Sequence, residues 1–389
     1  MNQGKYIFAQ LTDFLPRRVF DRLVEKYSGN KKIRTFTCWN QMLCIIFGQL
    51  TARDSMRDLM LSLEAHKNKY YHLGLGSTVT RTNLGKANRN RDYRIYEEFA
   101  YTLIAEARNS YYRNDFEVKV DGDAYAFDSS TIDLCLNVFW WAEFRKHKGG
   151  IKLHTLYDVK TSIPTIVLIT NTKVHDVNML DELNYEKESF YIMDKGYVDF
   201  TRLHKLHTSS AYFITRAKDN MRFRRMYSCE VDKTTGIKCD QIGMLETYKS
   251  LKAYPDKLRR VKYYDEELDR EFVFITNNME LSVEKIALLY KNRWQVELFF
   301  KWIKQHLKVK SFWGTTMNAV KTQVYCAIIT YCLAAIVAYK LKINRPIYEI
   351  QQILSFSLLD KIPVREILTD CDYKNVKELN YKQLKISWD

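Results

Sequence analysis

Several patterns that define other classes of protein are missing from this 389-residue sequence. Its eight cysteines form no C-x-x-C pair and no cysteine and histidine cluster at zinc spacing, which argues against a disulfide framework or a zinc site. The N-terminal stretch lacks the long apolar core of a signal peptide. The charge-free run from Val324 to Tyr339 is shorter than the roughly 20 apolar residues that span a bilayer. We therefore expect a cytoplasmic protein without a membrane partner, in which this run forms a buried core helix.

Positive charge is what the sequence has in excess. It contains 61 Lys and Arg residues against 46 Asp and Glu residues, for a formal net charge of +15. Such a balance favours polyanionic partners such as nucleic acid, although solubility or an acidic membrane surface would also explain it. The length exceeds that of a usual single domain, and 46% of the residues are hydrophobic, so we expect two or three domains around a large core.

The N-terminal region is predicted to be helical. Residues 37–64 have apolar side chains at helical spacing, interrupted near Thr51, which indicates two helices. The following stretch, "TVTRTNLGKANRNRDYRIYEEF", is rich in basic side chains: Arg81, Lys86, Arg89, Arg91 and Arg94. A helix-turn-helix-like DNA reader would be built this way, with its last short helix in the major groove. A solvated basic face on an ordinary helical bundle would show the same pattern, and this segment alone favours neither.

The middle of the chain changes to the pattern of strands. Short apolar or alternating runs bounded by Gly, Pro, Asp or Ser occur at 124–131, 151–159, 164–170, 189–194 and 211–215. The "VKTSIP" turn joins the second and third runs as a hairpin, whereas a helix between the fourth and fifth requires a parallel crossover. We therefore predict an α/β or α+β core with a mixed five-stranded sheet. Residues 219–280 contain further strand patterns and little helix, which indicates a β-rich insertion.

A helix is predicted to begin after Ser282 and to continue directly through the stretch "YKNRWQVELFFKWIKQHLK". On a helical wheel with Tyr290 at zero, Arg293 falls at about −60°, Glu297 at about −20° and Lys304 at about −40°. These four side chains share one narrow face, next to an apolar arc that would pack on the sheet. Simple salt bridges between Glu297 and its basic neighbours, worth about 0.3–0.5 kcal/mol each, would also explain the stripe.

Two aspartates stand where predicted strands end. Asp128 follows "YAF" and Asp194 follows "FYIM". Carboxylates at the carboxyl ends of strands in open α/β sheets point into the crevice where ligands bind, although an Asp after a strand is also ordinary turn chemistry. Asp123 is the best rival, whereas Asp121, Asp133 and Asp199 are weaker candidates because their neighbours do not fix their direction.

These residues resemble the signature of a known family, the DDE transposases of bacterial insertion sequences, and specifically the IS four family. That family has Y-x2-R-x3-E-x6-K, which is present here without a gap as Tyr290, Arg293, Glu297 and Lys304. Its two other acidic blocks match "FDSST" with Asp128 and "MDKGYVD" with Asp194. The resemblance covers about residues 120–340 well and the N-terminal region more loosely, and the acidic triad shows no departure from the pattern.

The resemblance implies an RNase H-like (retroviral integrase-like) catalytic core at 116–340, interrupted by the β-rich insertion at 219–280. It also implies a helical DNA-binding domain at 1–115 and a helical C-terminal region at 341–389. Asp128, Asp194 and Glu297 would be the catalytic metal ligands. Because they are carboxylates without thiols or clustered histidines, two Mg²⁺ ions are expected, with Mn²⁺ as a possible substitute.

The implied activity is cut-and-paste transposition. The protein would bind the terminal inverted repeats of its element, cut double-stranded DNA and join the resulting 3′-OH to target DNA, with a hairpin route suggested by the family. Tyr290, Arg293 and Lys304 would contact phosphates near the cleaved bond, and Arg81, Lys86 and Arg89 would contact the terminal repeat. A homodimer in the DNA complex and a bacterial cytoplasmic, nucleoid-associated location are also implied. Dimerisation would use helices at about 346–370, which could equally pack within one chain.

Two other functions use some of the same features. An RNase H-like DNA nuclease without strand transfer would need the acidic triad but has no reason to keep the Tyr, Arg and Lys spacing. A non-catalytic DNA-binding protein derived from a transposase would be supported by an eroded triad, and the triad here is intact. Further candidates carry less weight: the pair His175 and Asp176, the basic residues Lys301 and Lys308, and the base-stacking candidates Trp140 and Trp141.

Overall fold

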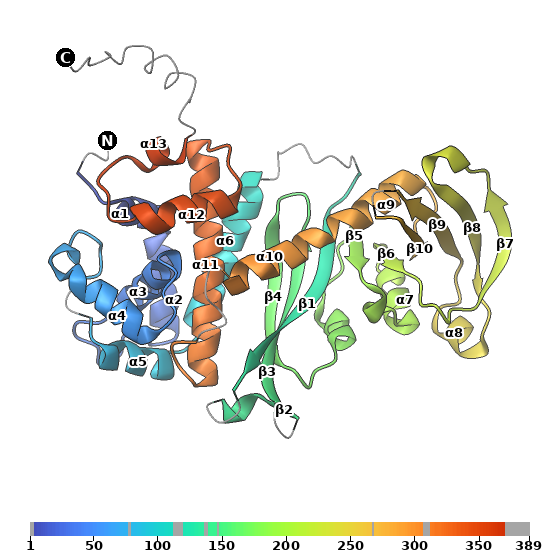
Figure 1. The fold of residues 1–389 in the computed structure, drawn as a ribbon. Helices are drawn as coiled ribbons and strands as arrows, with labels where there is room; N and C mark the ends of the chain where they lie inside the picture. The colour runs from blue at the N-terminus through green and yellow to red at the C-terminus, as the bar shows by residue number, and fades with distance from the viewer. Residues whose placement is uncertain are drawn as a thin grey trace, which may run out of the picture.

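The computed structural model shows a helical body joined to a long sheet that extends away from it (Figure 1). The first and last described helices both belong to the helical body, so the two ends of the described chain lie on the same side of the molecule. The structure describes residues 4–76, 79–111, 120–135, 139–145, 148–266, 268–305 and 312–369.

The N-terminal helices begin where the sequence supplies capping side chains. Thr37, Ser55 and Thr80 each accept a hydrogen bond from a backbone N–H of the helix that follows, which satisfies a donor that has no partner within the helix. The two helices predicted for 37–64 are present and are separated after Thr51. The helices of this region are α1 Ile7–Thr12, α2 Arg17–Lys26, α3 Cys38–Leu50, α4 Met56–Ala65, α5 Arg81–Asn90 and α6 Arg94–Tyr111.

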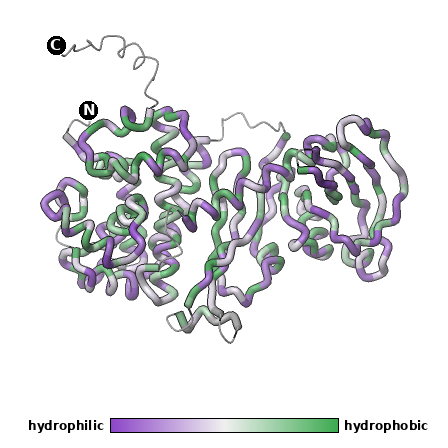
Figure 2. The backbone as a smooth tube through the Cα atoms, in the orientation of Figure 1, coloured by the Kyte–Doolittle hydropathy of each residue, from purple (hydrophilic) through white to green (hydrophobic). Residues whose placement is uncertain are grey.

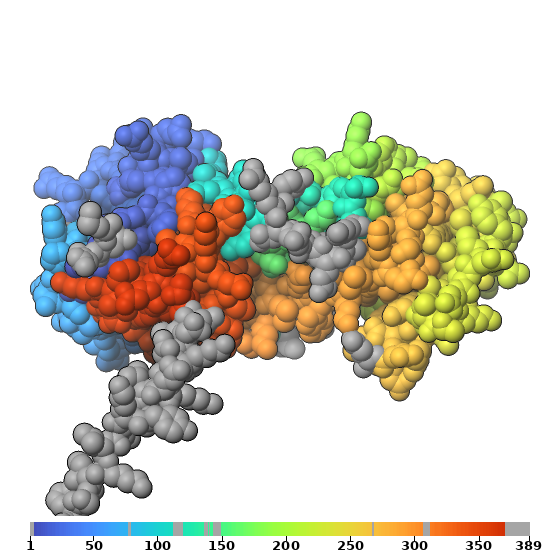
Figure 3. Space-filling model, turned by 90° about the horizontal axis from the view of Figure 1, so that it is seen from above, coloured from blue at the N-terminus to red at the C-terminus, as the bar shows by residue number. Residues whose placement is uncertain are grey.

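The C-terminal helices pack on the N-terminal ones. These are α11 Met317–Leu341, α12 Ile347–Ser357 and α13 Val364–Leu368. The backbone N–H groups of Ile7 and Phe8 in α1 donate to the carbonyls of Asp360 and Leu358, both at 3.0 Å. Figure 3 shows the red C-terminal helices lying against the blue N-terminal residues. The two ends of the chain therefore share one helical body.

The strands before the insertion follow the predicted runs closely. They are β1 Ala124–Leu134, β2 Glu143–Arg145, β3 Lys148–Asp158, β4 Ile163–Asn171, β5 Phe190–Met193 and β6 Tyr212–Arg216. The β1, β3 and β4 strands pair antiparallel, and β5 pairs parallel with both β1 and β6. The mixed sheet predicted from the turn and the crossover is therefore confirmed.

The prediction of a five-stranded sheet is wrong. In the part of the chain that the structure describes, one sheet contains ten strands, in the order β2-β3-β1-β5-β6-β10-β9-β8-β7 with β4 paired to β3. The inserted strand β10 pairs antiparallel with β6, so the insertion continues the core sheet. The inserted elements are β7 Phe223–Cys229, β8 Ile237–Leu245, α8 Tyr248–Ala253, β9 Leu258–Asp265 and β10 Arg270–Thr276.

Helices cover both faces of the core part of the sheet. On one face, α7 Phe200–Thr208 covers a cluster that includes Tyr125, Phe127 and Met193. On the other face lie α9 Val283–Asn292, which packs through Ile286 and Leu289, and α10 Trp294–Gln305, which packs through Val296, Phe299 and Phe300. The short 3-10 helices are η1 Lys67–Lys69, η2 Trp140–Ala142, η3 Asp176–Glu182, η4 Lys195–Tyr197 and η5 Lys233–Thr235.

The single long helix predicted after Ser282 is divided at Arg293. Ser282 caps α9 as predicted, but the Arg293 N–H donates to Tyr290 O at 3.1 Å and the Val296 N–H donates to Arg293 O at 3.2 Å. These bonds span three residues rather than four, which tightens the backbone between α9 and α10. No glycine or proline marks this position.

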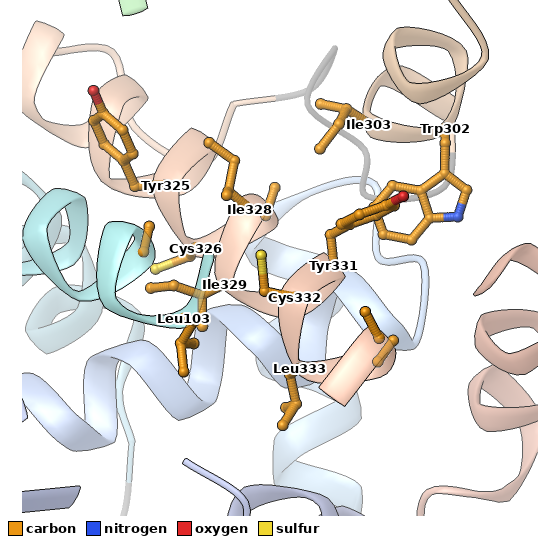
Figure 4. Close-up of a cluster of buried hydrophobic side chains, with 14 of the residues drawn as sticks. Leu103, Trp302, Ile303, Tyr325, Cys326, Ile328, Ile329, Tyr331, Cys332 and Leu333 are labelled. Atoms are coloured by element: carbon orange, nitrogen blue, oxygen red, sulfur yellow. The ribbon is translucent and has the colours of Figure 1, made fainter. Parts of the chain in front are cut away.

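The charge-free run forms the central core helix α11. It passes a length and composition test for a membrane span, but 83% of its most apolar window is buried inside the protein. Figure 2 shows this apolar helix enclosed by other helices, and Figure 4 shows its side chains interlocked with those of α6 and α10. Trp302 of α10 meets Tyr331 of α11 edge-on, with ring centroids 4.6 Å apart. This contact holds α10 against α11 of the helical body.

Candidate active site

The strand register brings the two predicted aspartates together. The β1 and β5 strands run parallel, and their last paired residues are Phe127 and Met193. Asp128 and Asp194 come next on the two strands, so the register places their backbones beside each other. Asp128 lies within β1 and Asp194 precedes η4, where β5 has ended. The prediction of a strand end is confirmed for Asp194 and is wrong for Asp128, because β1 continues to Leu134 in its pairing with β3.

Glu297 reaches this edge from the first turn of α10. The helix runs across the sheet beside β1 (Figure 1), held there by the buried side chains of Val296 and Phe300. Arg293 connects Glu297 to Asp128: one guanidinium nitrogen donates to Asp128 Oδ2 at 2.9 Å and the other to Glu297 Oε1 at 2.7 Å. The Arg293 side chain is only 13% exposed. Two of the three predicted acids are thus bridged by a largely buried cation.

Asp194 is held by a different pair of residues. Tyr290 donates its hydroxyl to Asp194 Oδ1 at 3.1 Å, and Arg216 donates to the same oxygen at 2.7 Å and 3.1 Å. Sequence reasoning missed Arg216, which ends β6. The parallel crossover between β5 and β6 was predicted, but the register Met193 to Thr215, which brings Arg216 opposite Asp194, comes from the structure.

The two aspartates have opposite electrostatic environments. Burial raises the pKa of Asp128 to about 6, against the effects of the Ser129 N–H and of Arg293. Burial also acts to raise the pKa of Asp194, but the Lys195 backbone N–H and the Arg216 guanidinium hold it below its usual value. Burial raises the pKa of Tyr290 to about 12, so its hydroxyl remains a donor at neutral pH.

The last residue of the predicted motif lies further along α10. Lys304 donates from Nζ to Thr131 O at 2.7 Å, on the part of β1 beyond Asp128. Lys301 is exposed on the same helix. Lys308 lies outside the described residues. The Tyr290, Arg293, Glu297 and Lys304 side chains therefore follow one line along the sheet edge, even though the helix is divided at Arg293.

The side chains of the three acids are of the chemical type that binds a metal ion. Asp128, Asp194 and Glu297 offer only carboxylate oxygens, which hard cations such as Mg²⁺ prefer. Beside them, the hydroxyl of Thr155, which pairs with Asp128 in the sheet, and Nε of Arg293 are buried without a hydrogen-bond partner. Among the described residues, no three His, Cys, Asp or Glu side chains are gathered closely enough to hold an ion together. Arg293 and Arg216 instead neutralise the acids.

The other candidate residues lie apart from this arrangement. Asp123 lies just before β1 begins, where its Oδ2 accepts from the Tyr125 hydroxyl at 3.1 Å. Asp176 accepts from Ser129 Oγ at 2.8 Å and pairs with Lys152 at 3.0 Å. Side chains alternate along a strand, so Ser129 and its partner Asp176 face away from the side of the sheet that Asp128 faces.

The predicted DNA-binding residues of the N-terminal region lie together on α5. Arg81, Lys86 and Arg89 are exposed and line one cavity with the loop before α11. That loop is connected to the core, because Trp141 donates from Nε1 to Thr315 O at 2.7 Å. The side chain of Trp140 is outside the described set.

Comparisons with known proteins place the chain in a family. Residues 120–333, more than half of the chain, match the family described as "Transposase DDE domain". The chain belongs to the DDE transposase family. The matched segment of this transposase contains Asp128, Asp194 and Glu297 together with the whole inserted β region. Residues 3–76 match a second family, described as "Domain of unknown function (DUF4372)".

Named relatives agree with this assignment. A "Putative transposase y4zB" from Sinorhizobium fredii is 34% identical over 291 residues, which are 73% of this transposase and 79% of the relative. A "Probable transposase for insertion sequence element IS5377" from Geobacillus stearothermophilus is 31% identical over 212 residues, 53% and 54% of the two chains. A "Putative transposase for insertion sequence element IS4SA" from Synechocystis is 25% identical over 268 residues, 66% and 72% of the two chains.

A solved structure of piggyBac transposase, in a synaptic complex with hairpin DNA, is similar at a TM-score of 0.46 and 11% identity. The match covers 100% of this chain and 88% of that one. Transposases of the DDE family act on DNA and depend on divalent metal ions. The prediction of a DDE transposase is therefore confirmed at the level of the family.

Proposed function

We propose that this protein is the transposase of a bacterial insertion sequence of the IS four family. It would bind the terminal inverted repeats of its element, cut the DNA and transfer the new ends to a target. The observation that carries the proposal is one set of contacts around the three acids: Arg293 joins Asp128 to Glu297, and Tyr290, in the preceding helix, donates to Asp194. The parallel register of β1 and β5 supports the two aspartates, and the Arg293 bridge supports Glu297.

The proposed metal ligands are Asp128, Asp194 and Glu297, with Mg²⁺ as the expected ion and Mn²⁺ as a substitute. When bound, two such ions would lower the pKa of water and stabilise the developing charge on the leaving 3′ oxygen. The protein's own contribution is to orient the three carboxylates on a rigid frame. The β1 and β5 strands fix two of them, and the contact between Trp302 and Tyr331 fixes the helix that carries the third.

The basic side chains have a second task in this proposal. If metal ions replaced the present hydrogen-bond partners of the acids, those cationic and hydroxyl donors would become free beside the site. They could then position phosphates of the substrate. Arg293, Tyr290 and Lys304 are proposed to contact phosphates next to the reacting one. Arg216, at the end of β6, extends the same set of donors around Asp194.

We also propose a division of labour within the chain. Residues 1–115 would recognise DNA through α5, residues 116–340 would carry the chemistry, and the C-terminal region, 341–389, would support the helical body through α12 and α13. A homodimer would pair two transposon ends. The bacterial cytoplasm, at the nucleoid, is the proposed place of action.

The decisive experiment uses a duplex that carries the terminal sequence found beside the gene. Purified protein, the duplex, Mg²⁺ and a supercoiled target plasmid are incubated, and the products are separated on denaturing and native gels. The proposal predicts cleavage that leaves a 3′-OH at the element end, followed by joined products. Cleavage without joining would support a nuclease, and binding without cleavage would support a DNA-binding derivative.

A further inference from the structure

A cavity at the junction of α5 and α11 gathers positive charge outside the acidic site. Its volume is about 580 Å³. The residues that line it are Met56, Arg81, Thr82, Gly85, Lys86, Arg89, Trp313, Gly314, Thr315, Thr316 and Ala319. Three of these are cations, and none is an Asp or Glu. The described wall of the cavity therefore has one sign of charge.

The three cations have no internal partner. Arg81, Lys86 and Arg89 are exposed, and within the described residues none of them takes part in a hydrogen bond or ion pair. Arg94, a few residues further on, is different because it pairs with Asp92 at 2.6 Å. Exposed like charges that are left unpaired around a concave surface attract a polyanion and raise its local concentration.

The backbone adds to this field. The helix α11 begins at Met317 beside the cavity, is 25 residues long and has no acidic side chain in its first turn. Its cap Thr316 lines the cavity and accepts from the Ala319 N–H at 3.2 Å. The N-terminus of a helix this long carries partial positive charge and favours an anion.

A buried indole provides an independent indication of a ligand. Trp313 lines the cavity and is 5% exposed, yet its Nε1–H has no hydrogen-bond partner. The benzene edge of this ring is pressed on α3, because a Cβ built on Gly48 would lie 2.5 Å from Trp313 Cη2. This contact involves the end of the ring system that is furthest from the N–H. An unsatisfied buried donor costs free energy unless a bound acceptor completes it.

The junction is held rigidly. Asn318, in the first turn of α11, donates to the carbonyls of Asn88 at 2.9 Å and Arg91, and it accepts from the Tyr93 N–H at 3.1 Å. These bonds join α5 to α11 next to the residues that line the cavity, and Figure 1 shows α5 beside the end of α11 nearest β2. The two helices that carry the lining residues are thus joined before any ligand binds, which reduces the cost of ordering them on binding.

We propose that this cavity binds one backbone phosphate of the terminal-repeat DNA and thereby sets the position of α5 on the duplex. The proposal rests on the proposed function, since it takes transposon-end DNA as the ligand. The cavity is also connected to the core, because Trp141, which follows β1, donates to Thr315 in its wall. A phosphate bound here therefore contacts the same loop that is hydrogen-bonded to the catalytic core.

The test pairs protein variants with single neutral phosphates. Methylphosphonates are placed one at a time along a duplex that carries the terminal sequence, and the dissociation constant of each duplex is measured for the natural protein, Arg89→Ala and Trp313→Phe. One position should weaken binding by the natural protein about fivefold to tenfold, because a charged hydrogen bond is lost. At that position alone, the methylphosphonate should weaken DNA binding by Arg89→Ala and Trp313→Phe little further.

Lys67→Ala is the matched control, because Lys67 is an exposed cation of the same helical body outside the cavity. It should keep the full methylphosphonate effect at that position. Additive effects at every position for Arg89→Ala and Trp313→Phe would overturn the proposal. Thermal unfolding of each variant verifies that the fold is retained.

Binding and cleavage separate the two levels of inference. If the coupling is found and cleavage never occurs, the phosphate cavity stands and the proposed catalytic function fails. If cleavage occurs and no position shows coupling, the catalytic function stands and the phosphate cavity fails.

Discussion

The charged side chains are paired with each other at the acidic edge of the sheet and unpaired on the basic face of α5. At the sheet edge, Asp128 and Glu297 share Arg293, and Asp194 is held by Arg216. On α5, the three cations at the cavity have no partner within the described structure. One site can accept a ligand only by giving up internal contacts, whereas the other is open. The difference indicates which site must rearrange during the reaction and which can bind first.

Burial explains why the two regions differ. The Arg293 side chain is 13% exposed and that of Asp128 is 19% exposed, so neither charge could stay unpaired without a large desolvation cost. Arg81 and Arg89 are exposed and keep their hydration. Unpaired charge is therefore tolerated on α5 in the absence of DNA, but at the sheet edge it needs a counterion from the protein or from solution.

Removing one carboxylate should have the largest effect. Asp128→Asn, Asp194→Asn and Glu297→Gln are each expected to reduce cleavage of an end-containing duplex with Mg²⁺ by more than about 100-fold, because even the outer partners of metal ligands are worth 10–100-fold. Band-shift binding of the same duplex should remain nearly intact, since α5 is unchanged. Cleavage by denaturing gel and binding by band shift measure the two effects separately.

Asp123→Asn is the control for the acids. It alters a carboxylate that comes directly before the same strand and contacts Tyr125. Cleavage should persist in this variant. If Asp123→Asn abolished cleavage and Asp128→Asn did not, the triad would be assigned to the wrong end of β1.

Removing the bridging cation should shift stability. Arg293→Gln leaves Asp128 and Glu297 facing each other, and breaking a buried pair on one side costs about 3–5 kcal/mol, here toward the lower end because Glu297 is 31% exposed. Added Mg²⁺, without DNA, should recover more of the free energy of unfolding in this variant than in the natural protein, because an ion can replace the lost charge. Urea unfolding with and without Mg²⁺ measures both quantities.

Lys301→Met provides the comparison for Arg293. It removes an exposed cation from the same helix and should change the free energy of unfolding by less than about 0.5 kcal/mol. Equal stabilities of Arg293→Gln and the natural protein would mean that the acids do not depend on Arg293 for neutralisation.

A third region contains a buried histidine, His154, whose titration should make the stability of the protein depend on pH. Burial lowers the pKa of His154 to about 4, while Asp176 opposes this shift and Lys152 adds to it. Because the unfolded chain would bind a proton at about pH 6.5, stability should fall as the pH drops from 6.5 towards 4, by at most about 3 kcal/mol from this residue. In His154→Gln the fall in the free energy of unfolding over that range should be smaller. An unchanged pH dependence would show that His154 is protonated in the fold.

The sequence was sufficient for features that depend on local pattern. Alternating apolar residues and the polar residues that end each run located β1, β3, β4, β5 and β6 within a few residues, and they placed Asp194 correctly at the end of β5, whereas β1 continues past Asp128 to Leu134. Fixed spacing on one helix then selected Glu297. These signals are local because side-chain direction follows directly from the period of the backbone.

Features that depend on distant pairing were missed. The strand β8, with the polar sequence "IKCDQIGML", has no clean alternation, and its place in the sheet depends on pairing with β7 and β9. The continuity of the ten strands depends on the pairing of β10 with β6. The break at Arg293 has no Gly or Pro signal, and Arg216 acquires its role only through the register of β6 against β5.

The smallest expected effect is on the salt dependence of DNA affinity, measured for one cation from each region. Arg89→Ala should flatten the dependence of DNA affinity on salt by about one counterion, because each neutralised phosphate contributes about 0.9 to the slope for duplex DNA. Lys304→Ala should flatten it less, since Lys304 already donates to Thr131 O at 2.7 Å and must leave that bond to reach a phosphate. Affinity for one duplex, measured over a range of KCl concentrations, gives both slopes. Equal slopes for the two variants would mean that the sheet edge is as open to DNA as α5, and the contrast between the regions would then apply only to the protein without DNA.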